Sequence, residues 1–297
     1  MKLVVLILLL IILFIVVNKS NQKEFFTNGR KMAVLIHTFD GYSRYWKPLL
    51  YFTNKYLNID YDIYIGVEDM DIPQEILGRV KILKSGKGSF VDRLESHLNK
   101  LEEKGYKYIY LMQEDHWYTK HTSHGIKHNK IFDDCINFME KNKIDCLKLH
   151  QLSMLPFNVK NVDKYPNKLL NKNLYYPNKK YKDRQNLGIS HNGCIVTLKL
   201  LKHSCDITKL KGYSTAKGHE YATVSKEFGD VKRKRGDTGL NILQTDRENT
   251  ILKFEHVGYG GKLNVFGKNA LKREKLENII NEMNSQENQI RKRQEIR

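Results

Sequence analysis

Three side chains suited to binding a divalent metal ion follow a short, uninterrupted apolar run. The run is Tyr108–Met112, and Glu114, Asp115 and His116 follow it after a single glutamine. A run of this kind is typical of a strand buried on both faces of a parallel sheet. In open α/β sheets, ligands bind just past the carboxyl ends of the strands. Two carboxylates and an imidazole at that place could hold a metal ion, or a phosphorylated substrate through one. The alternative is an acidic turn that simply leaves the strand.

The segments around this run indicate an α/β fold with a mostly parallel central sheet. Apolar runs bounded by turn residues predict the strands, and apolar residues at helical spacing predict the helices. The predicted strands are 32–38, 62–67, 79–83, 108–112, 145–149, 194–198 and 250–254. The predicted helices are 46–57, 90–104, 131–141 and 217–228, followed by a helix-prone stretch beyond 268. Because strands and helices nearly alternate over the first half, we expect a Rossmann-like sheet flanked by helices.

The helix before the acidic strand carries its own start and stop signals. Ser89 is suited to the N-cap, and Asp92 stands at the third helical position in a variant of the capping box. Gly105 is suited to the helix end because glycine readily adopts the left-handed conformation. Asp92 therefore has a capping role available to it as well as a place near the expected ligand site.

The composition indicates a folded and strongly basic protein. Of 297 residues 40% are hydrophobic, and 51 Lys and Arg against 33 Asp and Glu give a net charge of +18. Such a surplus favours polyanionic partners, unless it is a lysine-rich bias spread over a solvated surface. No nucleic-acid-binding signature occurs, so nucleic acid is disfavoured as a partner. The four cysteines show no metal-ligand spacing, and their pairing stays open.

An apolar run near the start of the chain predicts a membrane anchor. Leu3–Val17 are fifteen consecutive apolar residues, flanked by Lys2 and Lys19. As a helix they would span ~22 Å, short of a ~30 Å hydrocarbon core that flanking lysines can help to bridge. A cleaved signal peptide is the alternative, although no small-residue cleavage site follows the run. We expect a single-pass, membrane-anchored protein whose orientation the flanking charges leave open.

The chain then divides into four segments. We expect a transmembrane signal-anchor at 1–18, a polar linker at 19–30, one α/β domain at 31–264 and a charged helical tail at 265–297. Within the domain, residues 150–186 are rich in Asn, Lys, Tyr and Pro and lack periodicity. A surface excursion of this length is often functional.

Several histidines near the acidic run suggest a second kind of metal site. His121, His124 and His128 follow His116 within thirteen residues. Zinc is bound by side chains of this type, but the spacing matches neither HExxH nor a paired Cys/His pattern. A metal-dependent hydrolase that uses this His116–His128 cluster, and a polar loop without such a role, both stay open.

Taken together, these pieces resemble a glycosyltransferase of the GT-A type, closest to the family-2-like enzymes. Four features in order carry the resemblance over residues 32–262: the acidic turn 38–42, the helix opening 88–94, the strand end 108–116 and the segment 218–222. The third feature is similar to the family's strand that ends in an Asp-any-Asp metal motif. One departure is that His116 stands where the family has aspartate. Imidazole can also bind Mn²⁺, so the motif can still hold a metal ion.

The resemblance implies a GT-A-like domain that transfers a sugar from a nucleotide-sugar donor with inversion. An implied Mn²⁺ or Mg²⁺ would neutralise the leaving diphosphate as a Lewis acid. The implied metal ligands are Glu114, Asp115, His116 and His256. The residues implied to contact the nucleotide sugar are Asp40, Glu68, Asp92 and Arg93. The implied catalytic base is Glu220, although a carboxylate in a first helical turn is also favoured by the helix dipole.

The partners implied are the donor and a glycan or a protein- or lipid-linked acceptor, with the sugar, the nucleotide and the acceptor undetermined. Two other classes of function stay open. One is a membrane-tethered basic module that binds an anionic partner without catalysis. The other is the metal-dependent hydrolase described above. Metal-dependent binding of a nucleotide would distinguish a glycosyltransferase from both of these alternatives.

Overall fold

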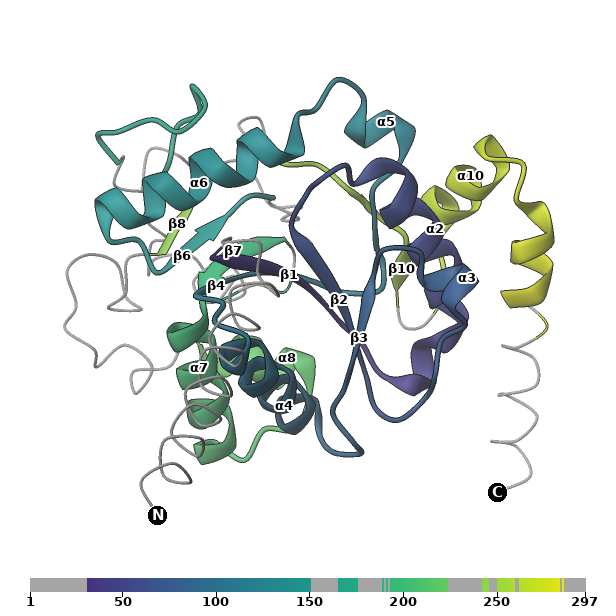
Figure 1. Ribbon diagram of the computed structural model, residues 1–297, viewed down its shortest axis with the longest axis horizontal. Coiled ribbons are helices and arrows are strands. Elements are labelled where there is room, and N and C mark those ends of the chain that lie inside the picture. Colours follow the sequence, from purple (N-terminus) through teal and green to yellow (C-terminus); the bar gives the residue numbers. More distant parts are fainter. Residues whose placement is uncertain are drawn as a thin grey trace, which may run out of the picture.

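The computed structural model describes residues 31–150, 165–175, 189, 191, 193–223, 242–245, 250–259, 262–283 and 285. Within this part of the chain, a seven-stranded sheet lies at the centre with helices on both faces (Figure 1). The strand order is β3-β2-β1-β4-β7-β6-β8. The strands are β1 (Met32–His37), β2 (Asp62–Val67), β3 (Lys81–Lys84), β4 (Tyr108–Met112), β6 (Cys146–Lys148), β7 (Cys194–Thr197) and β8 (Ile242–Gln244).

Most neighbouring strands of the sheet are parallel. The strands β3, β2, β1 and β4 pair in parallel, as do β6 and β8, whereas β7 runs antiparallel to β4 and β6. This pairing confirms the predicted mixed α/β class with a mostly parallel sheet. Because the first four strands point the same way, their carboxyl ends meet at one edge, where ligands bind in such folds.

Helices cover both faces of the sheet. They are η1 (Asp40–Tyr45), α2 (Trp46–Tyr56), α3 (Gln74–Leu77), α4 (Phe90–Glu103), α5 (Lys120–Ser123), α6 (His128–Asn142), α7 (Leu198–Leu210), α8 (Ala216–Ala222) and α10 (Val265–Arg273). The helices α4, α7 and α8 pack against one another on one face. The helices α2 and α6 lie on the other face, with α10 beside α2 (Figure 1).

Strand β1 separates the two halves of the apolar core. Met32 and Ile36 belong to the half that contains α2 and α6, whereas Leu35 belongs to the half that contains α4 and α7. Side chains of a strand point alternately to its two faces. His37 therefore leaves the end of β1 on the α4 face, and Thr38 leaves it on the α2 face. These two neighbours reach the two polar clusters described below.

The start of α4 follows from its local sequence. The Ser89 hydroxyl accepts a hydrogen bond from the Asp92 amide, and the Asp92 carboxylate accepts one from the Ser89 amide at 3.2 Å. The predicted capping box is thereby confirmed. Gly105 follows the helix with φ of +89°, in the region that favours glycine. The next strand, β4, can therefore begin only a few residues later.

One predicted strand, residues 250–254, is wrong. The amides of Ile251 and Leu252 both donate to the carbonyl of Leu149, at 2.9 and 3.1 Å. Two successive amides that share one acceptor turn the backbone, whereas in a strand they point to opposite sides. The strand of this region is instead β9 (Glu255–His256), which pairs antiparallel with β5 (His116–Trp117). A further hairpin joins β10 (Gly258–Tyr259) to β11 (Lys262–Leu263).

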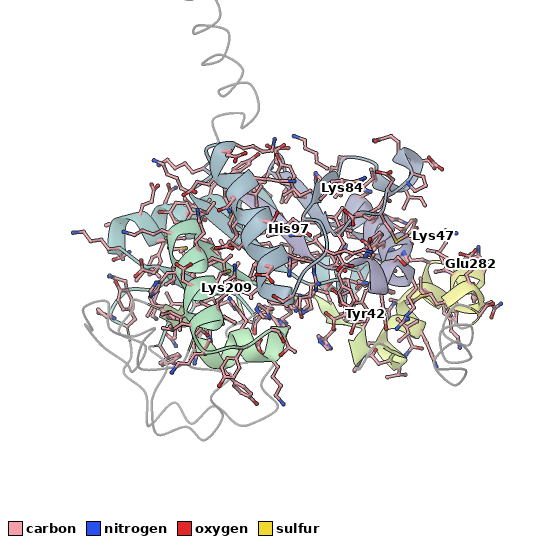
Figure 2. The ribbon with its side chains drawn as sticks, turned by 90° about the horizontal axis from the view of Figure 1, so that it is seen from below. Tyr42, Lys47, Lys84, His97, Lys209 and Glu282 are labelled. Atoms are coloured by element: carbon pink, nitrogen blue, oxygen red, sulfur yellow. The ribbon has the colours of Figure 1, made fainter. Side chains whose placement is uncertain are left out.

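The described part of the C-terminal segment packs on α2. The Glu274 carboxylate, after α10, accepts hydrogen bonds from Tyr51 at 3.0 Å, Lys55 at 2.5 Å and Tyr56. Residues 277–283 are helical as well. Figure 2 shows Lys47 of α2 beside Glu282 of this second helix, and their charged atoms are 3.0 Å apart. The predicted charged tail therefore begins with helices that dock on the domain.

The expectation of a membrane-anchored protein is corrected. Across the residues given above, no helix is long and apolar enough to cross a bilayer. The apolar run Leu3–Val17, on which that expectation depended, lies outside the described residues. The helices described here are amphipathic and pack on the sheet, so they bury their apolar faces within the fold.

Candidate active site

Asp115, His116 and His256 form the candidate metal site. The pairing of β5 with β9 sets His116 opposite His256, and Asp115 directly precedes β5. The Nε2 atom of His256 lies 3.0 Å from Oδ2 of Asp115, and Nε2 of His116 lies 3.5 Å from Oδ1. Potential ligand atoms of the three residues all lie within 4.8 Å of one another. In the described part of the chain, this is the one group of three such side chains arranged closely enough to hold an ion.

The two histidines of this group differ in what they can offer. The amide of Gln113 donates to Nδ1 of His116 at 3.3 Å, and His116 is fully buried. A neutral imidazole with an accepting Nδ1 carries its proton on Nε2, where it faces Asp115. His256 is 31% exposed and has an Nε2 atom next to the carboxylate. Asp115 can therefore act as a ligand, and Nε2 of His256 can do so by exchanging its proton for the ion, while His116 orients Asp115 from behind.

The Asp115 carboxylate is held ready in its charged form. Burial raises the pKa of this carboxyl, but the hydrogen bond with His256 and the charges of His116 and His256 outweigh it, so the pKa lies below its usual range. The Oδ1 atom is buried and has no hydrogen-bond partner among the described residues. A buried, charged oxygen that has Nε2 of His116 near it but accepts no hydrogen bond is stabilised well by a cation. Carboxylate and imidazole ligands suit Mn²⁺ and related divalent ions.

Glu114 is a neighbour of the candidate metal site but is not one of its three residues. Its carboxylate accepts a hydrogen bond from the hydroxyl of Thr38, which itself accepts one from the Trp46 indole at 3.2 Å. Burial, and next the charge of Asp115, raise the pKa of Glu114 to about 8. Near neutral pH Glu114 is therefore mostly protonated in the absence of a cation. The sequence did not single out Thr38, whose part in the site depends on the end of β1 meeting the end of β4.

Two tyrosines of η1 face the acidic loop. Burial raises the pKa of Tyr42, and so do the nearby charges of Glu114 and Asp115. The pKa of Tyr45 rises to about 12, mainly through burial. Arg44 lies between them, 5.9 and 5.4 Å from the two ring centres, and its charge acts on Glu114. Tyr42 and Arg44 therefore flank the site with a hydroxyl and a cation that sequence reasoning missed.

Asp40, Glu68 and Arg93 form a second polar group at the ends of β1 and β2. The Asp40 carboxylate accepts from the amides of Glu68, Asp69 and Met70 at 3.0 to 3.1 Å. Arg93 reaches Glu68 at 3.2 Å and lies over the ring of Phe39, 4.9 Å from its centre. The structure thus brings three of the four residues predicted to contact the nucleotide sugar into one network.

The fourth residue of that prediction, Asp92, lies elsewhere in this region. It caps α4 through Ser89, and its other carboxylate oxygen is 3.1 Å from Lys209 of α7. Its side chain is 53% exposed. Hydrogen bonds from Ser89 and Lys209 lower the pKa of Asp92. These contacts account for the residue structurally, and its predicted contact with a ligand stays a prediction.

Glu220 lies on α8 at the α4 face of the sheet. The Thr215 hydroxyl accepts from the Gly218 amide and caps this helix. The Glu220 carboxylate is 16% exposed and lies 3.7 Å from Nδ1 of His191. The amide of His191 also donates to it at 3.4 Å. Glu220 is therefore not among the three residues of the metal group, and its role as a base stays a prediction.

The histidine cluster predicted as an alternative zinc site does not assemble as such. Of His116, His121, His124 and His128, the first alone belongs to the metal-binding group found among the described residues. His128 instead begins α6 and is buried, with its ring centre 5.6 Å from that of Tyr118. Both of its ring nitrogens lack a hydrogen-bond partner in the described structure. Its surroundings therefore offer no second ligand.

No family model and no curated protein sequence matches the chain. Among solved structures, it is similar to a cytidylyltransferase from Leptospira borgpetersenii serovar Hardjo-bovis, with 14% identity and a TM-score of 0.41 over 76% of this chain and 79% of that one. It is also similar to glucosyl-3-phosphoglycerate synthase from Mycobacterium tuberculosis, with 8% identity and a TM-score of 0.34 over 68% and 71%. Because these scores are low, the fold assignment depends on the sheet itself.

Proposed function

We propose that this chain is a metal-dependent glycosyltransferase that moves a sugar from a nucleotide-sugar donor to a hydroxyl acceptor. The observation that carries the proposal is the group Asp115, His116 and His256 at the carboxyl edge of the parallel sheet. The charged Asp115 oxygen that accepts no hydrogen bond, together with the neighbouring His256 nitrogen, fits a divalent cation. When bound there, Mn²⁺ or Mg²⁺ would stabilise the negative charge of a leaving diphosphate.

Arg93 supports a nucleotide-sugar site at the same edge. It is 11% exposed, and its buried Nε atom has no hydrogen-bond partner among the described residues. A buried guanidinium donor of this kind suits a phosphate or a sugar hydroxyl. In this proposal Arg93 contacts the donor, and Asp40 and Glu68 hold the surrounding loops. Arg44, in the last turn of η1, adds positive charge around the donor.

Glu220 is the proposed base for the acceptor. Its carboxylate is partly exposed on α8, and α8 lies at the face of β1 opposite the metal group. A base on that side takes the proton of the acceptor hydroxyl as the hydroxyl oxygen attacks the anomeric carbon. The diphosphate leaves from the other side, on the side of Asp115. This arrangement produces inversion at the anomeric carbon.

The proposal is tested by the release of nucleoside diphosphate from a panel of UDP- and GDP-sugars, with a panel of glycans as the hydroxyl acceptor. We expect release to require Mn²⁺ or Mg²⁺ and to fall about 100-fold in Glu220→Gln, as for loss of a general base. Glu103→Gln, an exposed carboxylate at the end of α4, is the matched control and keeps the wild-type rate. If the purified protein instead hydrolyses these nucleotide sugars only with zinc, and His121→Ala abolishes this hydrolysis, the result would favour the metal-dependent hydrolase.

A further inference from the structure

A cluster of four buried histidines lies on the α4 face of the sheet, and three of them contact the ring of Phe90. The ring centre of Phe90 lies 4.6 Å from that of His37, 5.0 Å from His191 and 5.8 Å from His219. The fourth histidine, His97, bonds to His37 at 3.2 Å. This cluster lies on the side of β1 opposite the Asp115 group. The proposed transfer assigns no role to this cluster, although His191, one of its members, lies beside Glu220.

A chain of hydrogen bonds fixes the protons of two of these histidines. The Ser204 hydroxyl donates its one proton to the Leu201 carbonyl at 2.5 Å. Ser204 must therefore accept a proton from Nε2 of His219, which lies 2.8 Å away. A neutral His219 then has a bare Nδ1 that accepts from Nε2 of His191 at 2.9 Å. This leaves Nδ1 of His191 as the nitrogen without a proton.

That bare nitrogen faces the Glu220 carboxylate. Nδ1 of His191 and Oε1 of Glu220 are 3.7 Å apart. When neither atom carries a proton, both are hydrogen-bond acceptors. One added proton could therefore bind to either atom and form a hydrogen bond to the other. Thr223 links the backbone of Glu220 to that of Ile189, two positions before His191, because its hydroxyl accepts from the Ile189 amide at 3.0 Å and donates to the Glu220 carbonyl at 2.8 Å.

We propose that His191 is a positioning residue for Glu220, and that the pair stores the proton removed from the acceptor hydroxyl. This inference depends on the proposed transferase function. The acceptor oxygen forms its bond to the anomeric carbon, the diphosphate leaves with the electron pair of the broken bond, and the hydroxyl proton passes to Glu220. It then moves to Nδ1 of His191, so that an imidazolium faces a carboxylate. Release to solvent after the product leaves restores the starting state.

The charges around the pair support this order of events. Burial lowers the pKa of His191, and Glu220 opposes this effect, so the imidazole is neutral and free to accept before the reaction. The neighbouring titratable groups come from several elements. His37 of β1 interacts electrostatically with His97 and Arg93 of α4, with His191 and with His219 of α8, and Cys194 of β7 does so with Glu220. Burial also lowers the pKa of His37 and His219, so both stay neutral. The added proton therefore stays on the His191–Glu220 pair.

The first test is independent of any enzymatic activity. Nitrogen NMR of the histidine-labelled full chain reports which ring nitrogen of each histidine carries the proton. We expect Nε2–H for both His191 and His219, and a change at Nδ1 of His191 in Glu220→Gln. A proton on Nδ1 of His191 in the wild-type protein would overturn the inference and leave the proposed function untouched.

The second test uses the donor panel with the variant His191→Gln. We expect kcat to fall about 100-fold, the KM for the donor to stay within about twofold, and the remaining rate to rise with pH, because Glu220 must then pass the acceptor proton directly to solvent. His37→Gln, equally buried at 2% exposure, is the control that keeps the wild-type pH profile. Equal pH profiles for both variants would contradict the proton-storing role. Absence of transfer in the wild type would contradict the function, and the NMR result then still decides the tautomers.

Discussion

Asp115 illustrates how the site is built at the scale of the residue. Its carboxylate is kept charged by His116 and His256 although it is largely buried, and one oxygen accepts no hydrogen bond. The sequence predicted Asp115 because a carboxylate follows an apolar strand. It also predicted His256, through resemblance. It could not predict that the Gln113 amide occupies Nδ1 of His116, since that bond depends on the turn between β4 and β5.

Substitution of Asp92 distinguishes a role in capping α4 from a role in binding the nucleotide. We expect Asp92→Ala to lower the free energy of unfolding by about 1 kcal/mol, because it removes one half of the capping box of α4. Nucleotide binding is expected to stay at the wild-type value. Urea unfolding and calorimetric titration with UDP measure the two effects. Tenfold weaker nucleotide binding with unchanged stability would show that Asp92 contacts the ligand.

At the scale of the elements, the strands and helices near the site could be predicted because their signals are local. The run Tyr108–Met112 became β4, and Ser89 with Asp92 began α4. The segment 250–254 was mistaken for a strand because its amides bond to Leu149, a residue about a hundred positions earlier. The buried histidines around Phe90 were missed for the same reason, since they come from β1, α4, α8 and an intervening loop.

The first residue of α6, His128, gives a pH dependence to the stability of the fold. Burial lowers the pKa of His128 from 6.5 to about 4. The unfolded chain therefore binds a proton between these values while the folded chain does not, so stability is lost as pH falls below about 6.5. We expect His128→Leu to reduce the loss of unfolding free energy between pH 7 and pH 5 by about 2 kcal/mol.

Urea unfolding of the wild type and of His128→Leu at the two pH values measures this difference. His121→Leu, which changes an exposed histidine of the neighbouring α5, is the control and keeps the wild-type difference. A variant at position 128 that loses as much stability as the wild type on acidification would show that His128 is not kept neutral in the fold.

At the scale of the whole molecule, the C-terminal helices close the α2 face of the core. Leu271 and Met283 are buried there, and Val257 and Ala270 join β9 to the same cluster. The sequence predicted helices in this segment and could not predict their docking, because Glu274 meets Tyr51, Lys55 and Tyr56 more than 200 positions away. Since β9 carries His256, this docking also supports one side of the metal group.

Glu274 is expected to hold this arrangement together. We expect Glu274→Ala to lower the free energy of unfolding by about 2 kcal/mol, because two partly buried tyrosine hydroxyls and Lys55 lose their acceptor. Glu277→Ala, an exposed neighbour, is expected to change it by less than about 0.5 kcal/mol. Denaturant unfolding of both variants measures the difference, and equal stability of the two would contradict the docking role.

The most direct measurement of the proposed function is calorimetric binding of UDP and of GDP to the full chain, with and without Mn²⁺. We predict that Mn²⁺ tightens binding of at least one nucleotide tenfold or more in the wild type and has no effect in Asp115→Asn. Asp71→Asn, an exposed carboxylate with 86% of its side chain accessible, should bind as the wild type does. Nucleotide binding that is the same with and without Mn²⁺ in the wild type, or a metal effect that survives in Asp115→Asn, would contradict the account.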